Sequence, residues 1–400
     1  MVWAPFPLAP ESGVTLDHAH KDIVIQAAFN TGGDRFVTAS YDKTVKVWDT
    51  ASQELISVFK GHEDEPIKAD FSPDGRHVAS VSRLGTVRVW NIETLEEVFR
   101  QESSSNHFSE SASPRYGSRG RLLLEFITGL SPSPFARRGS KLVNYDGAQM
   151  VVHDTRDWTT LHKLISDTNA GWPVISPSGG LVAKLTDKLD YIDVWDLDTG
   201  AKRYSLKGHD SGKQVFWAEF SNDSSQIVTC AMDKTAIVWD AGDGTKLARM
   251  EGHTSWLTQA RFSPGGDRIA TASADGTAKI WDTETGNHLS TLSNSTGRRR
   301  RISNVEFNPD PEVLRVLTTS TDDTIRIWAP DGAVARELLQ ITRDSKLIYA
   351  TWSPDGRRIL SCWKDGVVRL YGTIPWGHLA AIGDDSVEMQ ERISEWRASQ

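Results

Sequence analysis

The chain has few cysteines, no long apolar run and no excess of basic residues. Cys230 and Cys362 are the only cysteines among 400 residues. They are far apart and stand in strand-like stretches, so we expect two small buried side chains and no disulfide. No run of about 18 apolar residues exists, which predicts no transmembrane helix. The amino terminus does not read as a signal peptide, so these absences together predict a cytoplasmic or nuclear protein that is not attached to a membrane.

Basic residues are too few to cover the surface of a nucleic-acid-binding protein. The 45 Lys and Arg are outnumbered by the 53 Asp and Glu, which gives a net charge of −8. Proteins that bind nucleic acid normally carry a basic surface. We therefore do not expect direct nucleic-acid binding by the chain as a whole, although a local basic patch is compatible with this charge.

The short motifs of common enzyme sites are also absent. The sequence has no Gly-x-Ser-x-Gly elbow, no phosphate-binding Walker loop, no dinucleotide-binding fingerprint and no zinc-ligand spacing. We therefore predict no catalytic residue, no cofactor and no metal site, and we predict that the chain is not an enzyme.

Tryptophan is abundant, with 15 Trp against 7 Tyr, and it recurs at a regular spacing. In five units an aromatic residue before a turn is followed 19 residues later by a second, closing aromatic residue. These five pairs are Phe29 and Trp48, Phe71 and Trp90, Phe220 and Trp239, Phe262 and Trp281, and Trp352 and Tyr371. Two further units end at Trp195 and Trp328, and neighbouring closing residues lie 42 to 47 residues apart. A period of this length predicts a repeat architecture.

The gap of 105 residues between Trp90 and Trp195 is long enough for one more unit. Its runs are Leu122–Leu130, Lys141–Tyr145 and Ala148–His153, preceded by a Ser-rich loop insertion at 101–120 that we expect to be irregular. Counting this degenerate unit predicts eight repeats. If it does not form a sheet, the alternative is seven.

Each unit contains four short strand candidates separated by turns. In the sixth unit they are Leu257–Phe262, Arg268–Ser273, Ala278–Trp281 and His288–Leu292, with Pro264-Gly265-Gly266 and Asp275-Gly276 between them. Four strands in about 42 residues match one blade of a β-propeller. The sequence therefore predicts an all-β propeller of four-stranded antiparallel blades.

Recurring dipeptides support this prediction. They are Gly61-His62, Gly208-His209, Gly252-His253, Trp48-Asp49, Trp195-Asp196, Trp239-Asp240 and Trp281-Asp282. With these motifs in phase, the chain resembles the WD-repeat β-propeller family over roughly residues 14–372. We expect one propeller domain at 1–372 and a tail at 373–400. The tail contains a helix at 385–397 with Met389, Ile393 and Trp396 on one face. This helix either docks on the propeller or binds a partner.

The resemblance implies a hydrogen-bonded tetrad of His, Ser or Thr, Asp and Trp within a blade. The matching sets are His20, Ser40, Asp42 and Trp48, and His253, Ser273, Asp275 and Trp281. Other units depart from this pattern. Unit five has Ala231 at the Ser position, unit seven has Arg298 at the His position, and units two and four have Leu84 and Leu189 at the Asp position. Unit eight has Arg343, Trp363 and Tyr371 at the His, Ser and Trp positions. Because the set repeats in register, we interpret it as structural and not as a hydrolase triad.

The resemblance also predicts a contact surface. Residues that precede the tetrad Asp lie on one face of the family's propellers, called the top face, together with the loops that lead into each first strand. The candidates for partner binding are Tyr41, Arg83, Met232, Trp256 and Lys364. Trp, Tyr, Met and Arg are typical of interaction hot spots. For Trp256, packing between blades is the alternative.

Basic residues before the seventh unit form a second candidate surface. Arg298, Arg299, Arg300 and Arg301 form a patch that either binds an acidic partner or phosphate, acts in nuclear import, or is a solvated loop. Ser140 and Ser303 each follow two arginines in the manner of basophilic kinase sites.

From these features we predict a non-catalytic scaffold for protein–protein interactions, which acts as a monomeric platform within a larger complex. The alternative is a regulatory or substrate-recognition propeller that acts with a ubiquitin ligase or a nucleotide-switch protein. An enzyme on a propeller is the third possibility. We also expect Val14-Thr15-Leu16 to close the ring as the outer strand of the last blade.

Overall fold

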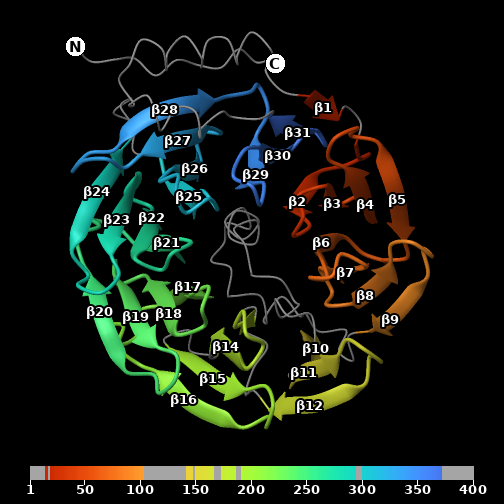
Figure 1. The fold of residues 1–400 in the computed structure, drawn as a ribbon, viewed down its shortest axis with the longest axis horizontal. Coiled ribbons are helices and arrows are strands. Elements are labelled where there is room, and N and C mark those ends of the chain that lie inside the picture. The colour runs from red at the N-terminus through yellow and green to blue at the C-terminus, as the bar shows by residue number, and fades with distance from the viewer. Residues whose placement is uncertain are drawn as a thin grey trace.

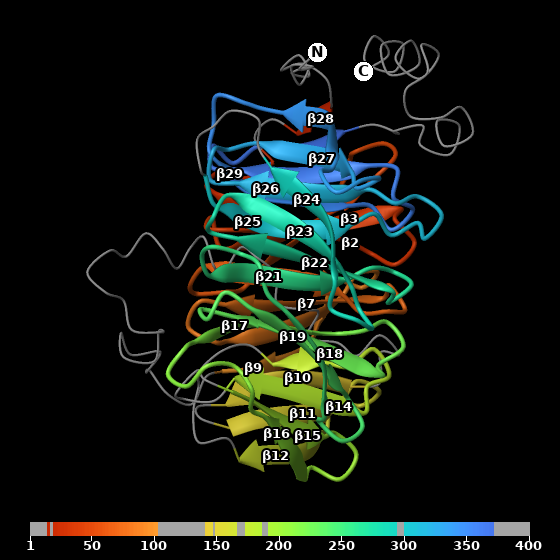
Figure 2. The same ribbon diagram turned by 90° about the vertical axis from the view of Figure 1, so that its left-hand side faces the viewer.

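The computed structural model is a ring of eight antiparallel β-sheets around a central axis (Figure 1). It describes residues 14–16, 19–102, 141–146, 149–165, 173–185, 191–293 and 300–371. Seen from the side, the strands of successive sheets lie one above another around the rim (Figure 2). The fold is the predicted all-β propeller, with eight blades.

In the first half of the ring the strands follow chain order from the axis to the rim. Blade one comprises β2 (Val24–Phe29), β3 (Arg35–Ser40), β4 (Thr44–Asp49) and β5 (Leu55–Lys60). Blade two comprises β6 (Pro66–Phe71), β7 (His77–Ser82), β8 (Val87–Asn91) and β9 (Glu97–Gln101). Blade three comprises β10 (Lys141–Asp146), β11 (Gln149–Asp154) and β12 (Thr160–Ile165). Blade four comprises β13 (Val174–Ile175), β14 (Leu181–Leu185), β15 (Ile192–Asp196) and β16 (Lys202–Leu206).

The second half repeats this order until the last blade. Blade five comprises β17 (Val215–Phe220), β18 (Gln226–Ala231), β19 (Ala236–Asp240) and β20 (Lys246–Met250). Blade six comprises β21 (Leu257–Phe262), β22 (Arg268–Ser273), β23 (Thr277–Asp282) and β24 (His288–Ser293). Blade seven comprises β25 (Ile302–Phe307), β26 (Val316–Ser320), β27 (Ile325–Ala329) and β28 (Arg336–Ile341). Blade eight comprises β29 (Leu347–Trp352), β30 (Ile359–Trp363), β31 (Val368–Tyr371) and β1 (Val14–Leu16).

The two ends of the described chain meet in blade eight. Strand β1 pairs antiparallel with β31, so that Val14 lies opposite Leu370 and Leu16 opposite Val368. Leu16 packs against the same apolar cluster as Leu370. The expected closure is therefore confirmed, and β31 does not present a free edge along these residues.

Apolar side chains fill the seams between blades, and each of the eight hydrophobic clusters joins two neighbouring blades. The closing aromatic residue of a blade belongs to the seam with the blade before it. Trp281 of blade six, for example, packs with Val228 and Val238 of blade five. In blade three His153 takes this place and lies 4.7 Å from the ring of Phe99 in blade two.

Blade three is a full member of the ring. Leu142 belongs to the seam with blade two, while Val143 and Met150 belong to the seam with blade four. This packing on both sides excludes the seven-bladed alternative. Of the expected features in this region, the run at 122–130 lies outside the described residues. Gln101, the first residue of the predicted insertion, is instead the last residue of β9, and its side chain contacts His153. Residues 103–120 lie outside the described residues.

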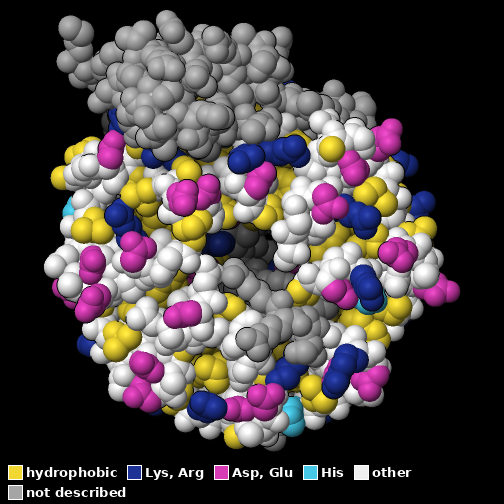
Figure 3. Space-filling model, viewed as in Figure 1, with side chains coloured by type: hydrophobic (Ala, Val, Ile, Leu, Met, Phe, Trp, Pro, Cys, Tyr) yellow, Lys and Arg dark blue, Asp and Glu magenta, His cyan; other side chains and the backbone are white. Residues whose placement is uncertain are grey.

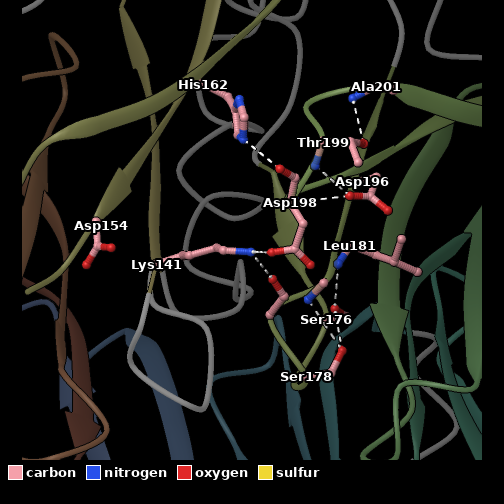
Figure 4. A network of polar contacts seen from close by, with 12 residues as sticks. Lys141, Asp154, His162, Ser176, Ser178, Leu181, Asp196, Asp198, Thr199 and Ala201 are labelled. Atoms are coloured by element: carbon pink, nitrogen blue, oxygen red, sulfur yellow. Dashed lines mark hydrogen bonds and ion pairs between the residues drawn. The ribbon is translucent and has the colours of Figure 1, made fainter.

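Polar contacts reinforce the joint between blades three and four (Figure 4). Lys141 of β10 pairs with Asp198 and donates to the carbonyl of Gly179 at 3.2 Å. His162 of β12 lies 2.9 Å from the backbone carbonyl oxygen of Asp198. Asp198 lies in the turn after β15. It is contacted by Lys141 from β10 and by His162 from β12, two strands of the preceding blade. A turn of blade four is in this way held against blade three.

Three further predictions concern single residues or the tail. Cys230 and Cys362 are both free and buried, as expected, and burial raises the pKa of each thiol. The helix expected at 385–397 lies outside the described residues.

Candidate functional site

Among the described residues, three blades contain a chain of four hydrogen-bonded side chains that ties a loop to the strands. In blade six, His253 Nδ1 lies 2.9 Å from Asp275 Oδ2, and His253 Nε2 lies 2.8 Å from Thr271 Oγ1. The indole N–H of Trp281 donates to the same Thr271 oxygen at 2.8 Å, and all four residues are buried. Equivalent chains join Asp42, His20, Thr38 and Trp48 in blade one, and Asp233, His209, Thr229 and Trp239 in blade five.

One protonation pattern satisfies every group in the chain. A neutral His253 donates from Nδ1 to Asp275 and accepts at Nε2 from the hydroxyl of Thr271, whose oxygen accepts from Trp281. Burial holds the pKa of His253 below 6.5, in spite of the hydrogen bond to Asp275. Although burial acts in the other direction, hydrogen bonds from His253 and Thr277 keep the pKa of Asp275 well below its ordinary value. A neutral imidazole beside an ionised carboxylate leaves no buried polar atom of the chain unpaired, which is a structural arrangement.

Ser40 and Ser273 do not occupy the tetrad hydroxyl position that the resemblance to the family predicts for them. Ser273 Oγ accepts the N–H of Asp275 at 3.1 Å and donates to the carbonyl of Trp256, also at 3.1 Å. Ser40 makes the equivalent contacts with Asp42 and Asp22. These serines stand at the ends of their strands, where the backbone of the turn uses their hydroxyls. The tetrad hydroxyl belongs to the threonine two residues earlier.

The threonine position could have been found from recurrence alone. A hydroxyl stands at this point of the second strand in six blades, as Thr38, Ser80, Thr229, Thr271, Thr318 and Ser361. It also explains why Ala231 does not interrupt the tetrad of blade five, since Thr229 supplies the oxygen there.

The blades that depart from the motif use other partners. In blade two His62 Nε2 lies 2.5 Å from Ser80 Oγ, and Leu84 stands at the Asp position with 49% of its surface exposed. In blade eight the indole N–H of Trp363 donates to Ser361 at 2.8 Å. Arg343 lies over the Trp363 ring, 5.9 Å from its centroid. Arg298 and Leu189 lie outside the described residues.

Blade seven places a cation inside the sheet. The guanidinium of Arg326 is buried and lies 2.9 Å from Asp322 and 3.5 Å from Glu337. The indole N–H of Trp328 still donates to Thr318, at 2.8 Å. An ion pair therefore holds the Asp322 turn in the absence of the tetrad histidine contact.

On the top face one backbone hydrogen bond recurs in six blades and defines six pairs of residues. The residue before the Asp position donates its N–H to the carbonyl of the residue before the first strand. The donors and acceptors are Tyr41 and Ile23, Arg83 and Glu65, Met232 and Gln214, Ala274 and Trp256, Thr321 and Arg301, and Lys364 and Lys346, with N···O distances of 2.7–3.0 Å. We call these the top-face pairs. The corresponding turns of blades three and four lie outside the described residues.

Each predicted contact residue belongs to a top-face pair. Met232 is 41% exposed, Arg83 and Lys364 are exposed, and Tyr41 is half-buried. Arg83 forms an ion pair with Glu65, its own pair partner, at 3.2 Å. The common backbone frame thus carries a different pair of side chains in each blade. On the face shown in Figure 3, acidic and basic side chains are interspersed around a central hollow.

Trp256 packs between blades and is half-buried. Its ring centroid lies 5.3 Å from that of Phe216 in blade five and 5.6 Å from the guanidinium carbon of Arg301 in blade seven. Of the basic patch, Arg298 and Arg299 lie outside the described residues, while Arg300 is exposed. Ser303 lies within β25, where its hydroxyl donates to the carbonyl of Thr319 at 3.2 Å. A kinase would have to open this strand to reach it.

Two solved structures share the whole fold with this chain. The C-terminal WD40 domain of Sif2 aligns with a TM-score of 0.71 at 13% identity, covering 92% of this chain and 99% of that domain. The computationally designed Ika8 protein aligns with a TM-score of 0.66 at 23% identity, covering 92% and 100%. At these identities the likeness concerns the fold alone.

Curated relatives match only short parts of the chain. Coronin-7 from Homo sapiens is 36% identical over 77 residues, which are 19% of this chain and 8% of coronin-7. The dynein assembly factor with WD repeat domains 1 from Xenopus laevis is 49% identical over 43 residues, 11% of this chain and 10% of that protein. The protein transport protein SEC31 from Pyricularia oryzae is 32% identical over 83 residues, 20% of this chain and 6% of SEC31. The chain thus spans at most about a tenth of the length of these relatives.

The repeat itself identifies the family. The WD domain, G-beta repeat, matches residues 12–49, 53–91, 200–240, 244–282 and 286–329, which together are about half of the chain. Each matched segment begins at the outer strand of one blade and ends after the third strand of the next, so every repeat bridges two blades. By this match and by its eight-bladed ring, the chain belongs to the WD40 family of β-propellers.

Proposed function

We propose that the chain is a non-catalytic platform that binds other proteins through its top-face pairs. The observation that carries this proposal is the recurring N–H···O=C bond, which fixes the backbone identically in six blades while the side chains differ. Such a frame presents varied chemistry at fixed positions, which suits recognition of a protein surface. The proposal includes a monomeric platform in a larger complex, in the cytoplasm or the nucleus.

The polar groups that resemble catalytic residues have structural partners. The His–Asp contacts recur in three blades and hold loops, whereas a catalytic centre would occur once. Among the described residues no group of three His, Cys, Asp or Glu is arranged to hold a metal ion. In the same part of the chain no helix is long and apolar enough to cross a bilayer. Two relatives are named for assembly and for protein transport, which supports a binding role.

A pair of matched variants tests the proposal. Met232 on the top face and Leu289 on the outer strand β24 have nearly the same exposure, 41% and 40%. Replacing either residue with Asp adds one negative charge at an exposed apolar side chain. We expect Met232→Asp combined with Lys364→Glu to lose proteins that the wild-type chain captures from lysate, while Leu289→Asp combined with Lys246→Glu retains them. Melting temperatures confirm that both variants are folded, and cross-links to the captured proteins map the contact.

The proposal fails if the folded top-face variant captures the same proteins as wild type. It also fails if the loss is equal in the outer-strand variant, since the effect would then follow from net charge.

A further inference from the structure

One outer strand of the ring is paired beyond its own blade. Thr291 of β24 donates its N–H to the carbonyl of Ala333 and accepts the N–H of Ala335, both at 2.9 Å. Thr291 and Val334 thus form a parallel bridge, through which the connection between β27 and β28 adds to the edge of blade six. We call residues 333–335 the strap. The strap shows that the rim of this ring accepts a further extended segment.

The strap covers one of two outer strands that begin without charged residues. Among the described outer strands of five or more residues, only β5 and β24 have no Asp, Glu, Lys or Arg in their first five residues. Charged side chains and covering segments are the usual protection of an edge strand against pairing with another chain. The strap provides this cover for β24. The other strand, β5, lies at the outer rim of blade one (Figure 1).

The outer edge of β5 presents the same backbone groups as that of β24. Val58 lies opposite Lys46 of β4, as Thr291 lies opposite Lys279 of β23. Because main-chain groups alternate along an antiparallel strand, the N–H and C=O of Val58 point away from β4, as those of Thr291 point away from β23. The two strands also have the same order of exposed and buried side chains. The edge that the strap uses in blade six therefore exists in blade one.

The corresponding connection of blade two does not cover this edge. It is closed on itself, since Leu95 donates its N–H to the carbonyl of Asn91 at 3.0 Å and Asn91 donates to the carbonyl of Glu96 at 2.9 Å. Among the described residues, no main-chain segment pairs with the outer edge of β5. The edge is thus uncharged over five residues and open.

The side chains of β5 define the chemistry that an added strand must have. Leu55 and Ile56 expose 45% and 41% of their surfaces. Glu54 precedes the strand and Lys60 ends it, and both are exposed. A segment that runs parallel to β5, as the strap runs along β24, would match these residues with aliphatic side chains, a basic residue at its start and an acidic residue at its end.

We propose that the outer edge of β5 binds an extended aliphatic segment of a partner protein, which pairs in parallel with β5 as a fifth strand of blade one. The inference goes beyond the proposed function, because it uses the rim and not the top face. An extended segment is the partner that can satisfy outward-pointing N–H and C=O groups along an edge, whereas a helix keeps its backbone groups for itself.

Binding of a defined probe tests the inference. The probe is a fluorescein-labelled peptide, Lys-Lys-Ala-Val-Ala-Val-Ala-Glu-Glu, and its match has Pro in place of both Val residues, which removes the N–H groups of an added strand. We expect the wild-type chain to bind the probe saturably and not its match. Bound probe should also slow hydrogen exchange of the Val58 amide.

Variants of the edge provide the controls. Val58→Pro removes the outward N–H, which blade one does not use, so it should weaken binding by at least about tenfold while the chain stays folded. Ile56→Lys places a charge on the edge and should also weaken binding. Leu247→Lys makes the same change of charge at the equivalent, 47% exposed position of β20 and should leave binding unchanged.

Several results would overturn the inference. These are no binding of the probe, equal binding of the proline match, an equal loss in Leu247→Lys, or unchanged binding by folded Val58→Pro. Binding only after deletion of residues 373–400 would identify the chain itself as the occupant, and a dimer that the probe dissociates would identify a second copy. The proposed function fails separately, since Met232→Asp with Lys364→Glu should bind the probe as wild type does.

Discussion

The hydroxyl of Thr271 accepts the indole N–H of Trp281 in the interior of blade six. The same oxygen faces His253 Nε2 at 2.8 Å, so one hydroxyl connects the closing aromatic residue to the loop histidine. The tetrad therefore depends on a residue in the middle of a strand, and the serine at the end of that strand has a smaller, local role.

Replacing Thr271 with Val should destabilise the protein more than replacing Ser273 with Ala. Valine keeps the shape of threonine but leaves Trp281 Nε1 and His253 Nε2 buried without a partner. Each such atom costs about 1–3 kcal/mol, whereas Ser273→Ala removes bonds to backbone at the edge of the turn and should cost about 1 kcal/mol. Urea unfolding of both variants measures the difference. Equal losses would show that the Thr271 hydroxyl contributes no more to stability than the Ser273 hydroxyl does.

Replacing Leu84 with Asp should add the missing carboxylate to the His62–Ser80 contact of blade two. Leu84 occupies the position of Asp275 in blade six, and His62 Nδ1 has no hydrogen-bond partner among the described residues. A carboxylate at position 84 would accept from this nitrogen, as Asp275 does from His253. Because Leu84 is 49% exposed, little apolar burial is lost. We expect about 1 kcal/mol of added stability and a higher pKa for His62.

Leu84→Ala is the matched control, since it removes the leucine without adding an acceptor. If Leu84→Ala is as stable as Leu84→Asp, the carboxylate does not reach His62. The titration of His62 followed by NMR provides an independent reading of the same contact.

The stability of blade two should depend on pH through His62. Burial, with a smaller contribution from Arg88, lowers the pKa of His62 from 6.5 to about 4. As the pH falls below 6.5, His62 becomes protonated in the unfolded chain but stays neutral in the folded protein. The free energy of unfolding therefore decreases progressively down to about pH 4. This pKa difference corresponds to about 3 kcal/mol at pH 4.

His62→Gln cannot take up this proton, and it provides the comparison. The difference in unfolding free energy between wild type and His62→Gln should shrink by about 3 kcal/mol between pH 7.5 and pH 4. A difference that stays constant over this range would show that His62 has an ordinary pKa in the folded protein.

The fold could be predicted from the sequence because each blade repeats the same apolar spacing. The four strands expected in unit six agree with β21 to β24 to within one residue at each end. The agreement is close because turn residues and a closing aromatic residue mark the ends of the strands. The sequence motif predicts the tetrad hydroxyl at Ser273, two residues after Thr271, where the structure has it. Thr271 and Ser273 both lie on the second strand, and spacing along one strand does not say which hydroxyl faces the histidine.

The sequence is even less informative where the same contact is made from different strands in different blades. In blade one Lys46 of β4 donates to the carbonyl of Ala19, directly before the tetrad histidine, at 2.5 Å. In blade five the carbonyl of Gly208, in the same position, accepts from Arg249 of β20 at 3.0 Å. The basic residue thus lies on the third strand in blade one and on the fourth strand in blade five, although it donates to the equivalent carbonyl in both. A repeat alignment places these two residues in different columns, so only the three-dimensional structure relates them.

The last prediction concerns the closure of the ring. Deleting residues 1–17 removes β1, exposes the backbone edge of β31 and uncovers part of the cluster that contains Val368 and Leu370. Loss of a strand at the point where the ring closes should lower the melting temperature by about 5 °C or more. It should also promote association, because an unpaired apolar edge can pair with another chain.

A shorter deletion separates closure from other effects of the amino-terminal residues. Deleting residues 1–12 keeps Val14–Leu16, so the melting temperature should match that of the full chain. Leu16→Asp in the full chain should reproduce part of the loss, because it places a charge in the cluster of Val368 and Leu370. If all three variants melt with the full chain, β1 contributes no stability and blade eight is held by its other three strands. If the two deletions lose equally, the stabilising contacts come from residues before Gly13, and the pairing of Val14 with Leu370 is not what closes the ring.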